Sequence, residues 1–317
     1  MPLTTLTLTT LLATSAPSFT AEPTTLTIGT VTLHGTLDRP TSPGPYPVAL
    51  IIAGSGPTDR DGNSAALPGR NDSLKALAED LACQGVATLR YDKRGIGAST
   101  TTQQEQDITL DTFVNDATAW LQQLQRDPRF ASVSVIGHSE GSLIGMLAAQ
   151  RTPIRAFISL AGPGENLADT LLRQLRANPN NPADLINDAE RILGNLRAGH
   201  PTPDVPPLLA PLFRPSVQPY LISILRHDPA QALTRVPARI LILQGDRDLQ
   251  VTPDDARALA AARPDAKLVI LPGMNHVLRT VGDDPTLNVR SYTDPSVPLA
   301  GDLARHIATF IRGTMTP

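Results

Sequence analysis

A serine lies between two glycines in the pentapeptide Gly-His-Ser-Glu-Gly at residues 137–141. A β-branched apolar run precedes it at 133–136, and a helix-forming run follows it at 142–150. Strand, sharp turn and helix in this order form a nucleophile elbow, which holds a serine hydroxyl at the edge of a sheet, above the first N–H groups of a helix. The pattern therefore predicts that Ser139 is a nucleophile; the alternative is an ordinary strand-to-helix loop.

A nucleophilic serine needs a neighbouring base, because its hydroxyl is scarcely ionised at neutral pH. His276 follows an apolar run at 267–271 that we expect to be a strand, so it would lie at the same sheet edge as Ser139. The other histidines fall in a predicted hairpin, in helical segments or, for His138, beside Ser139 with the ring expected to point away. We predict His276 as the base; the alternative is a loop histidine held by backbone hydrogen bonds.

The base in turn needs a carboxylate that fixes its tautomer and stabilises its charged form. The predicted strand at 239–244 ends in Gly245-Asp246-Arg247-Asp248, again at the carboxyl edge of the sheet. Asp248, three residues past the glycine, is the predicted partner of His276, and Asp246 is expected to hold the turn or pair with Arg247. The order serine, acid, histidine along the chain is the one found in α/β-hydrolases.

Small residues, Gly54-Ser55-Gly56, follow the apolar run at 48–53, which we expect to be a buried strand. Small side chains let a ligand approach backbone N–H groups. We predict an oxyanion hole in which Glu140 gives one N–H and either Ser55 or Gly56 gives the other. The acidic pattern at residues 59–63 superficially resembles a calcium loop, but its glycine is at the wrong offset and no glutamate follows at the twelfth position. We expect a hydrogen-bonded turn there, and no metal site.

The apolar runs alternate with helical patterns along most of the chain, which predicts an α/β fold. A hairpin is expected at 24–28 and 31–37, and buried strands are expected where continuous apolar runs occur. Near the end of the chain, helices are expected at 253–262 and 299–312. Sequential strands joined by helices require a mostly parallel sheet with helices on both faces. A turn at 92–99 is expected to be structural, with Asp92 and Arg94 paired or capping near the site.

Residues 164–235 interrupt this alternation with helical patterns and a proline-rich link, and we interpret them as an inserted helical cap. The predicted hydrolase core then comprises 24–163 and 236–317, and 1–23 is an N-terminal tail or weak signal segment. Four apolar cap residues are candidates for the wall of an acyl pocket: Leu208, Leu212, Phe213 and Tyr220. The alternative is that they form the cap's own core.

Composition excludes several functional classes. The net charge of −3 at pH 7 indicates no basic face for nucleic acid. Cys83 is the only cysteine, which excludes an intrachain disulfide, and we expect it to be buried in a helix. No apolar run reaches the length of a membrane span. Residues 1–21 lack charge, so secretion is the alternative to the cytoplasmic location that we expect.

Several stretches together resemble the α/β-hydrolase superfamily: the pentapeptide at 137–141, the turn at 90–99, Gly245-x-x-Asp248-x-x-Val251 and Asn275-His276. The loop at 53–63 is similar to that of bacterial EstD-type serine esterases, and the resemblance covers residues 28–311. It implies an eight-stranded sheet, an inserted cap, a Ser139–Asp248–His276 triad, hydrolysis of small short-chain acyl esters and no cofactor. Ala53 departs from the histidine that often precedes the oxyanion glycine.

Three alternatives remain on the same scaffold. A capped serine peptidase or an acyltransferase would use the same triad on another substrate. A non-catalytic binding protein would normally lack at least one of the three residues, and all three are present here. The sequence does not indicate an oligomeric state.

Overall fold

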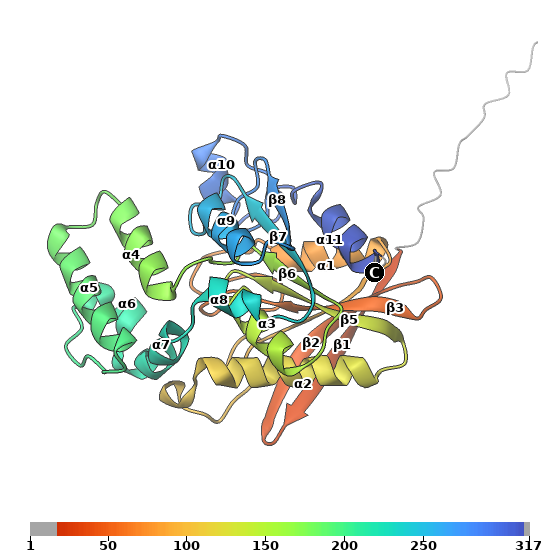
Figure 1. The fold of residues 1–317 in the computed structure, drawn as a ribbon, viewed down its shortest axis with the longest axis horizontal. Helices are drawn as coiled ribbons and strands as arrows, with labels where there is room; N and C mark the ends of the chain where they lie inside the picture. The colour runs from red at the N-terminus through yellow and green to blue at the C-terminus, as the bar shows by residue number, and fades with distance from the viewer. Residues whose placement is uncertain (1–17, 314–317) are drawn as a thin grey trace, which may run out of the picture.

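An eight-stranded sheet forms the centre of the computed structural model, which describes residues 18–313 (Figure 1). The strand order across the sheet is β1-β2-β4-β3-β5-β6-β7-β8. The pairs β1–β2 and β2–β4 are antiparallel, and every later pair is parallel, which confirms the expected hairpin and mostly parallel sheet. The strands are β1 (Phe19–Ile28), β2 (Val31–Pro40), β3 (Tyr46–Ile52), β4 (Ala87–Tyr91), β5 (Phe130–His138), β6 (Ala156–Leu160), β7 (Arg239–Gly245) and β8 (Lys267–Leu271).

The central strands are mostly apolar because both faces of the sheet are covered. In β3, Val48, Leu50 and Ile52 belong to the core on one face, and Ala49 and Ile51 belong to the core on the other. Successive side chains of a strand point to opposite faces, so a strand covered on both sides buries nearly every side chain, including the few polar ones such as Ser134 and Ser159. This is why the continuous apolar runs of the sequence became strands of the sheet interior.

Helices lie on both faces of the sheet (Figure 1). The apolar side of α1 (Ser73–Cys83) and of α11 (Leu303–Arg312) packs into one core. The other core takes apolar side chains from α2 (Leu110–Arg126), α3 (Glu140–Arg151) and α9 (Pro253–Ala262). A short 3-10 turn, η1 (Glu105–Asp107), precedes α2, and α10 (Pro285–Arg290) precedes α11.

The chain between β6 and β7 is helical, as expected for residues 164–235. Its elements are α4 (Leu167–Ala177), α5 (Ala183–Arg197), η2 (Pro207–Leu209), α6 (Ala210–Phe213), η3 (Pro215–Val217), α7 (Gln218–Leu225) and α8 (Pro229–Thr234). Helices α4 to α7 form a group at one end of the molecule, drawn in green to teal at the left of Figure 1. Helix α8 instead contacts α3 and α9 on the face of the sheet.

Four details of the structure differ from the expectations. The hairpin begins at Phe19, so residues 19–23 of the expected tail are part of β1. The last helix begins at Leu303 rather than at 299, after a turn. Cys83 is exposed, because the apolar stripe of α1 runs through Leu74, Leu77, Ala78 and Leu81 and leaves position 83 on the outside. The short α10 was not expected.

Two expectations concern a signal segment and a membrane span. Residues 1–17 of the predicted N-terminal tail or weak signal segment lie outside the described residues. No helix within residues 18–313 combines the length and the apolar character that crossing a membrane requires.

Candidate active site

The turn at Ser139 is a sharp and strained connection between β5 and α3. Ser139 has φ 54° and ψ −126°, a conformation that costs a non-glycine residue free energy and persists only where the surrounding packing imposes it. The flanking glycines allow the turn to be tight. A Cβ on Gly137 would lie 2.5 Å from Ser142 Cα, and one on Gly141 would lie 2.8 Å from Ala53 O.

Two segments hold Ser139 in place beneath the end of β3. Its N–H donates to Leu160 O at 3.0 Å, which ties the turn to β6. The backbone of Gly54 lies against the serine side chain, since a Cβ at Gly54 would be 3.0 Å from Ser139 Cβ and 3.5 Å from Ser139 Oγ. The hydroxyl therefore sits directly beside the small-residue loop that follows β3.

His276 and Asp248 meet at the same edge of the sheet. His276 Nδ1 lies 2.8 Å from Asp248 Oδ2, and both side chains are buried. Asp248 Oδ1 accepts hydrogen bonds from the N–H groups of Gln250 at 2.8 Å and Val251 at 3.0 Å. With Nδ1 donating to the carboxylate, Nε2 of His276 is left with a lone pair that can accept a proton.

The environment of Asp248 favours its ionised form. Burial opposes ionisation, but the charge and the hydrogen bond of His276, together with the N–H groups of Val251 and Gln250, outweigh it and lower the pKa of Asp248. Gln244 Nε2 lies 3.1 Å from Asp248 Oδ2 and adds a further donor.

Asp246 lies in the turn rather than against the imidazole. Its Oδ1 accepts a hydrogen bond from Gly273 N at 2.7 Å, and its Oδ2 pairs with Arg247 Nη1 at 3.3 Å. Both contacts were among the roles expected for it. The carboxylate that reaches His276 is that of Asp248.

His138 links the serine turn to the histidine loop, a contact that the sequence did not reveal. Its Nε2 lies 2.9 Å from His276 O, and the two imidazole rings have centroids 5.0 Å apart. Burial, with a smaller effect from the charge of His276, lowers the pKa of His138 to about 4, so the ring is neutral near pH 7 and Nε2–H donates to the carbonyl.

Among the described residues no hydrogen bond joins Ser139 Oγ to His276. In catalytic sites such a hydrogen bond is often long before substrate binds.

Three backbone N–H groups beside Ser139 are available to a ligand. Within residues 18–313, no protein group accepts a hydrogen bond from the N–H of Ser55, Gly56 or Glu140. Ser55 and Glu140 both line the cavity that contains Ser139, whereas Gly56 lines a neighbouring cavity with Glu140. The predicted donors are thus close to the serine, and Ser55 is the one of the two alternatives that faces the same cavity.

The turn after β4 brings an unexpected residue, Lys93, to the site. Its side chain is buried, its ammonium group donates a hydrogen bond to Gly54 O, and Nζ lies 3.9 Å from Glu140 Oε1. Asp92 and Arg94 do not pair with each other: Asp92 Oδ2 accepts from Ala98 N at 2.8 Å, and Arg94 pairs with Asp116 on α2.

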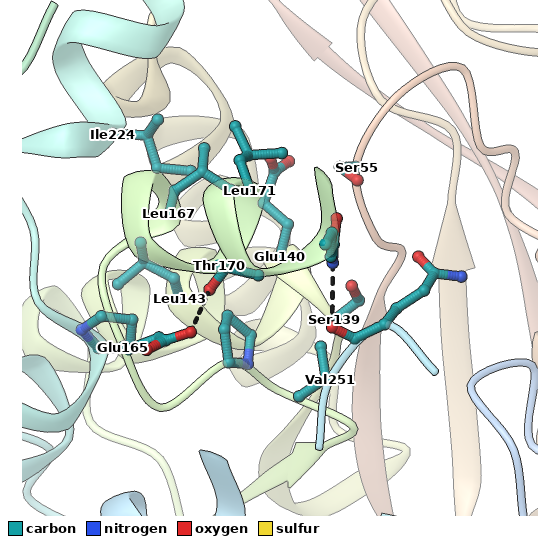
Figure 2. Close-up of a pocket in the computed structure, with 14 residues that line it drawn as sticks. Ser55, Ser139, Glu140, Leu143, Glu165, Leu167, Thr170, Leu171, Ile224 and Val251 are labelled. Carbon is teal, nitrogen blue, oxygen red and sulfur yellow. Dashed lines mark hydrogen bonds between the residues drawn. The ribbon is translucent and has the colours of Figure 1, made fainter. Parts of the chain in front are cut away.

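The cavity at Ser139 has a volume of about 90 Å³. Its apolar wall comes from α3, α4, α7 and the loop after β7. In that order, the wall residues are Leu143, Leu167 and Leu171, Ile224, and Val251 (Figure 2). Polar side chains at its margin include Glu165 and Thr170, which are joined by a hydrogen bond of 3.4 Å (Figure 2).

None of the four pocket residues expected from the sequence lines this cavity. Leu208 is 77% exposed and Leu212 is 38% exposed, because both lie on the outward side of the helical segment. Phe213 is fully buried in the packing of that segment, and Tyr220 lines the neighbouring cavity, where its ring meets Phe113 edge to face. The wall instead uses Leu167, Leu171 and Ile224, which lie in helices that were expected but whose inward faces the sequence did not identify.

The acidic loop at residues 59–63 is a hydrogen-bonded turn. Asp59 Oδ1 accepts from the N–H groups of Asp61 and Asn63, each at 2.9 Å. Asn63 in turn donates through Nδ2 to Asp72 Oδ1 at 2.8 Å. Among residues 18–313, no group of three or more histidine, cysteine or acidic side chains is arranged to hold a metal ion.

The fold and this arrangement at the carboxyl edge of the sheet define a known class. The chain belongs to the alpha/beta hydrolase family, whose sequence profile matches residues 31–289.

Among individual proteins, the chain is 27% identical over 253 residues to Esterase EstD of Thermotoga maritima. That match covers 78% of this chain and 58% of the relative, so the chain spans somewhat more than half of that relative's length.

Among solved structures, Est1E from Butyrivibrio proteoclasticus with bound ferulic acid has a TM-score of 0.57 at 24% identity, covering 84% of this chain and 94% of Est1E. The proline iminopeptidase of Mycobacterium smegmatis has a TM-score of 0.57 at 18% identity, covering 92% and 97% of the two chains. These structural likenesses show the fold.

Proposed function

We propose that this protein is a serine carboxylesterase that hydrolyses short-chain acyl esters through Ser139, Asp248 and His276. The observation that carries the proposal is the buried hydrogen bond between His276 and Asp248, in a loop joined through His138 to the strained Ser139 turn. The name of Esterase EstD, similar over 78% of this chain, supports the same activity.

The proposed reaction is a two-step transfer of an acyl group to water. His276 Nε2 takes the proton of Ser139 as the hydroxyl oxygen attacks the ester carbonyl, while Asp248 holds Nδ1–H and stabilises the imidazolium. The N–H groups of Glu140 and Ser55 bind the oxyanion, with Gly56 as the alternative donor. His276 then protonates the leaving alcohol, and water repeats the sequence on the acyl-enzyme.

The size of the cavity at Ser139 supports a short acyl group. An apolar cavity of about 150 Å³ accommodates benzene. The space beside Ser139, about 90 Å³, is smaller, and its apolar wall suits an acetyl to butyryl group rather than a long chain. In this proposal residues 164–235 act as a cap, because α4 and α7 supply Leu167, Leu171 and Ile224 to the wall.

Hydrolysis of p-nitrophenyl acetate and butyrate by the wild type and by Ser139→Ala tests the proposal. The wild type should turn over both esters, and the variant should lose turnover with an unchanged far-UV spectrum, because it lacks the attacking oxygen. Undiminished hydrolysis by Ser139→Ala would contradict it.

Two further assays separate the alternatives. Faster release of p-nitroaniline from aminoacyl anilides than of p-nitrophenol from esters would identify a peptidase. Transfer of the acyl group to an added alcohol or amine rather than to water would identify an acyltransferase. A fluorophosphonate that fails to label Ser139 would identify a non-catalytic binding protein.

A further inference from the structure

Lys93 is a buried cation that the reaction described above does not use. It follows β4 in a turn that Asp92 holds through hydrogen bonds from Arg60 N and Ala98 N, each at 2.8 Å. Only 3% of its side chain is exposed. Burying an ammonium group away from water is costly unless its partners compensate, so the contacts of this one indicate what it does.

The first contact is with the peptide group that joins Gly54 to Ser55. The ammonium group of Lys93 donates a hydrogen bond to Gly54 O. That carbonyl and the N–H of Ser55 belong to one planar, resonance-stabilised unit. A charged donor on the carbonyl oxygen draws electron density away from the nitrogen, so the N–H at the other end becomes a stronger donor.

The second and third contacts fix the ammonium group in place. Its Nζ lies 3.9 Å from Glu140 Oε1, on the residue that follows Ser139, and 5.4 Å from the ring centroid of Phe113 on α2. One cation therefore joins the loop that carries the N–H of Ser55 to the helix end that carries the N–H of Glu140. Burial lowers the pKa of Lys93, and the Glu140 carboxylate opposes that shift.

We propose that Lys93 is a positioning residue for the oxyanion hole: it sets the orientation of the Gly54–Ser55 peptide group and polarises its N–H toward the tetrahedral intermediate. This inference rests on the proposed esterase function. It also assigns Ser55, rather than Gly56, as the second donor, because the polarised peptide group is the one whose N–H belongs to Ser55.

The expected kinetic signature distinguishes this role from a purely structural one. An interaction that strengthens only as the oxyanion forms affects kcat and leaves KM unchanged. Removing an oxyanion donor lowers kcat by about 10²- to 10³-fold, and Lys93→Met, which only weakens one donor, should lower it roughly 10- to 100-fold. A trifluoromethyl ketone, which forms a tetrahedral adduct with an oxyanion, should bind weaker by the same factor.

The experiment compares Lys93→Met and Lys93→Arg with the wild type. The matched control is Lys75→Met on α1, where the lysine side chain is 41% exposed and pairs with Glu79. Active sites are counted first with a fluorophosphonate, so that rates and inhibition constants refer to folded sites only. We expect a kcat loss in Lys93→Met equal to its loss of ketone affinity, partial recovery in Lys93→Arg and wild-type behaviour in Lys75→Met.

Two results would overturn the inference: a wild-type kcat per active site in Lys93→Met, or a kcat loss without a matching loss of ketone affinity. If the wild type is labelled at Ser139 and hydrolyses the ester, either result would contradict the role of Lys93 but not the proposed esterase function. A wild type that is neither labelled nor active would instead contradict the proposed function itself.

Discussion

At the scale of single residues, the proposed chemistry depends on which aspartate meets the imidazole. Asp248 does so at 2.8 Å, and Asp246 is engaged with Gly273 N instead. Asp248→Asn should lower kcat by about 10⁴-fold, because an amide no longer enforces the tautomer that leaves Nε2 free to accept a proton. Asp246→Asn is the matched control and should retain most activity. Steady-state kinetics on p-nitrophenyl acetate decide the matter, and a larger loss in Asp246→Asn would move the acid to that residue.

The residues that meet in this site differ in how far the sequence indicated them. Ser139, Asp248 and His276 could be predicted because each follows a recognisable strand, and parallel strands end at one edge of a sheet. Lys93 and His138 could not, since their roles depend on contacts with Gly54 O and His276 O, which only the folded chain brings within reach. A polar contact between distant segments leaves no periodic signal in the sequence.

At the scale of elements, the site depends on the close approach of β5 and α3. Gly137→Ala would place a methyl group 2.5 Å from Ser142 Cα, so it should destabilise the fold by about 1–3 kcal/mol. Gly194→Ala in α5, where a Cβ meets nothing within 4 Å, should stabilise by about 0.5–1 kcal/mol. Urea denaturation of both variants checks the pair. Equal stabilities would mean that the β5–α3 turn is looser than described.

Long elements could be read from the sequence, whereas short ones could not. The bounds of β8 and α9 coincide with the apolar run and the helical pattern that predicted them. The six-residue α10 has only Asn288 buried, so it carries no apolar stripe that would identify it. The expected start of α11 at 299 is four residues early, because apolar residues at 299 and 300 extend the pattern of the helix into the preceding turn.

At the scale of the whole molecule, the helices between β6 and β7 supply part of the wall of the cavity. The sequence indicated these helices, but not which of their faces meets the sheet, because an amphipathic stripe does not say what covers it. For this reason the sequence favours Leu208 and Phe213 as wall residues, although one is exposed and the other lies inside the helical segment. Leu171 of α4 lies against the space beside Ser139 instead (Figure 2).

Enlarging that space should change the preference for acyl chains. Leu171→Ala removes three carbons from the wall, so it should raise kcat/KM for p-nitrophenyl octanoate relative to acetate by roughly tenfold. Leu208→Ala, at a position 77% exposed, should leave the ratio unchanged. A scan of chain lengths from acetate to palmitate measures both. The same shift in both variants, or none in either, would contradict the pocket described.

The central claim is that the hydroxyl of Ser139 takes the acyl group from the ester. The most direct test is to quench the wild-type protein with acid during the turnover of p-nitrophenyl acetate and to locate the acetyl group by peptide mass spectrometry. We predict an acetyl group on the peptide that contains Ser139, absent from Ser139→Ala. An acetyl group on any other residue during productive turnover, or none on Ser139, would contradict the account.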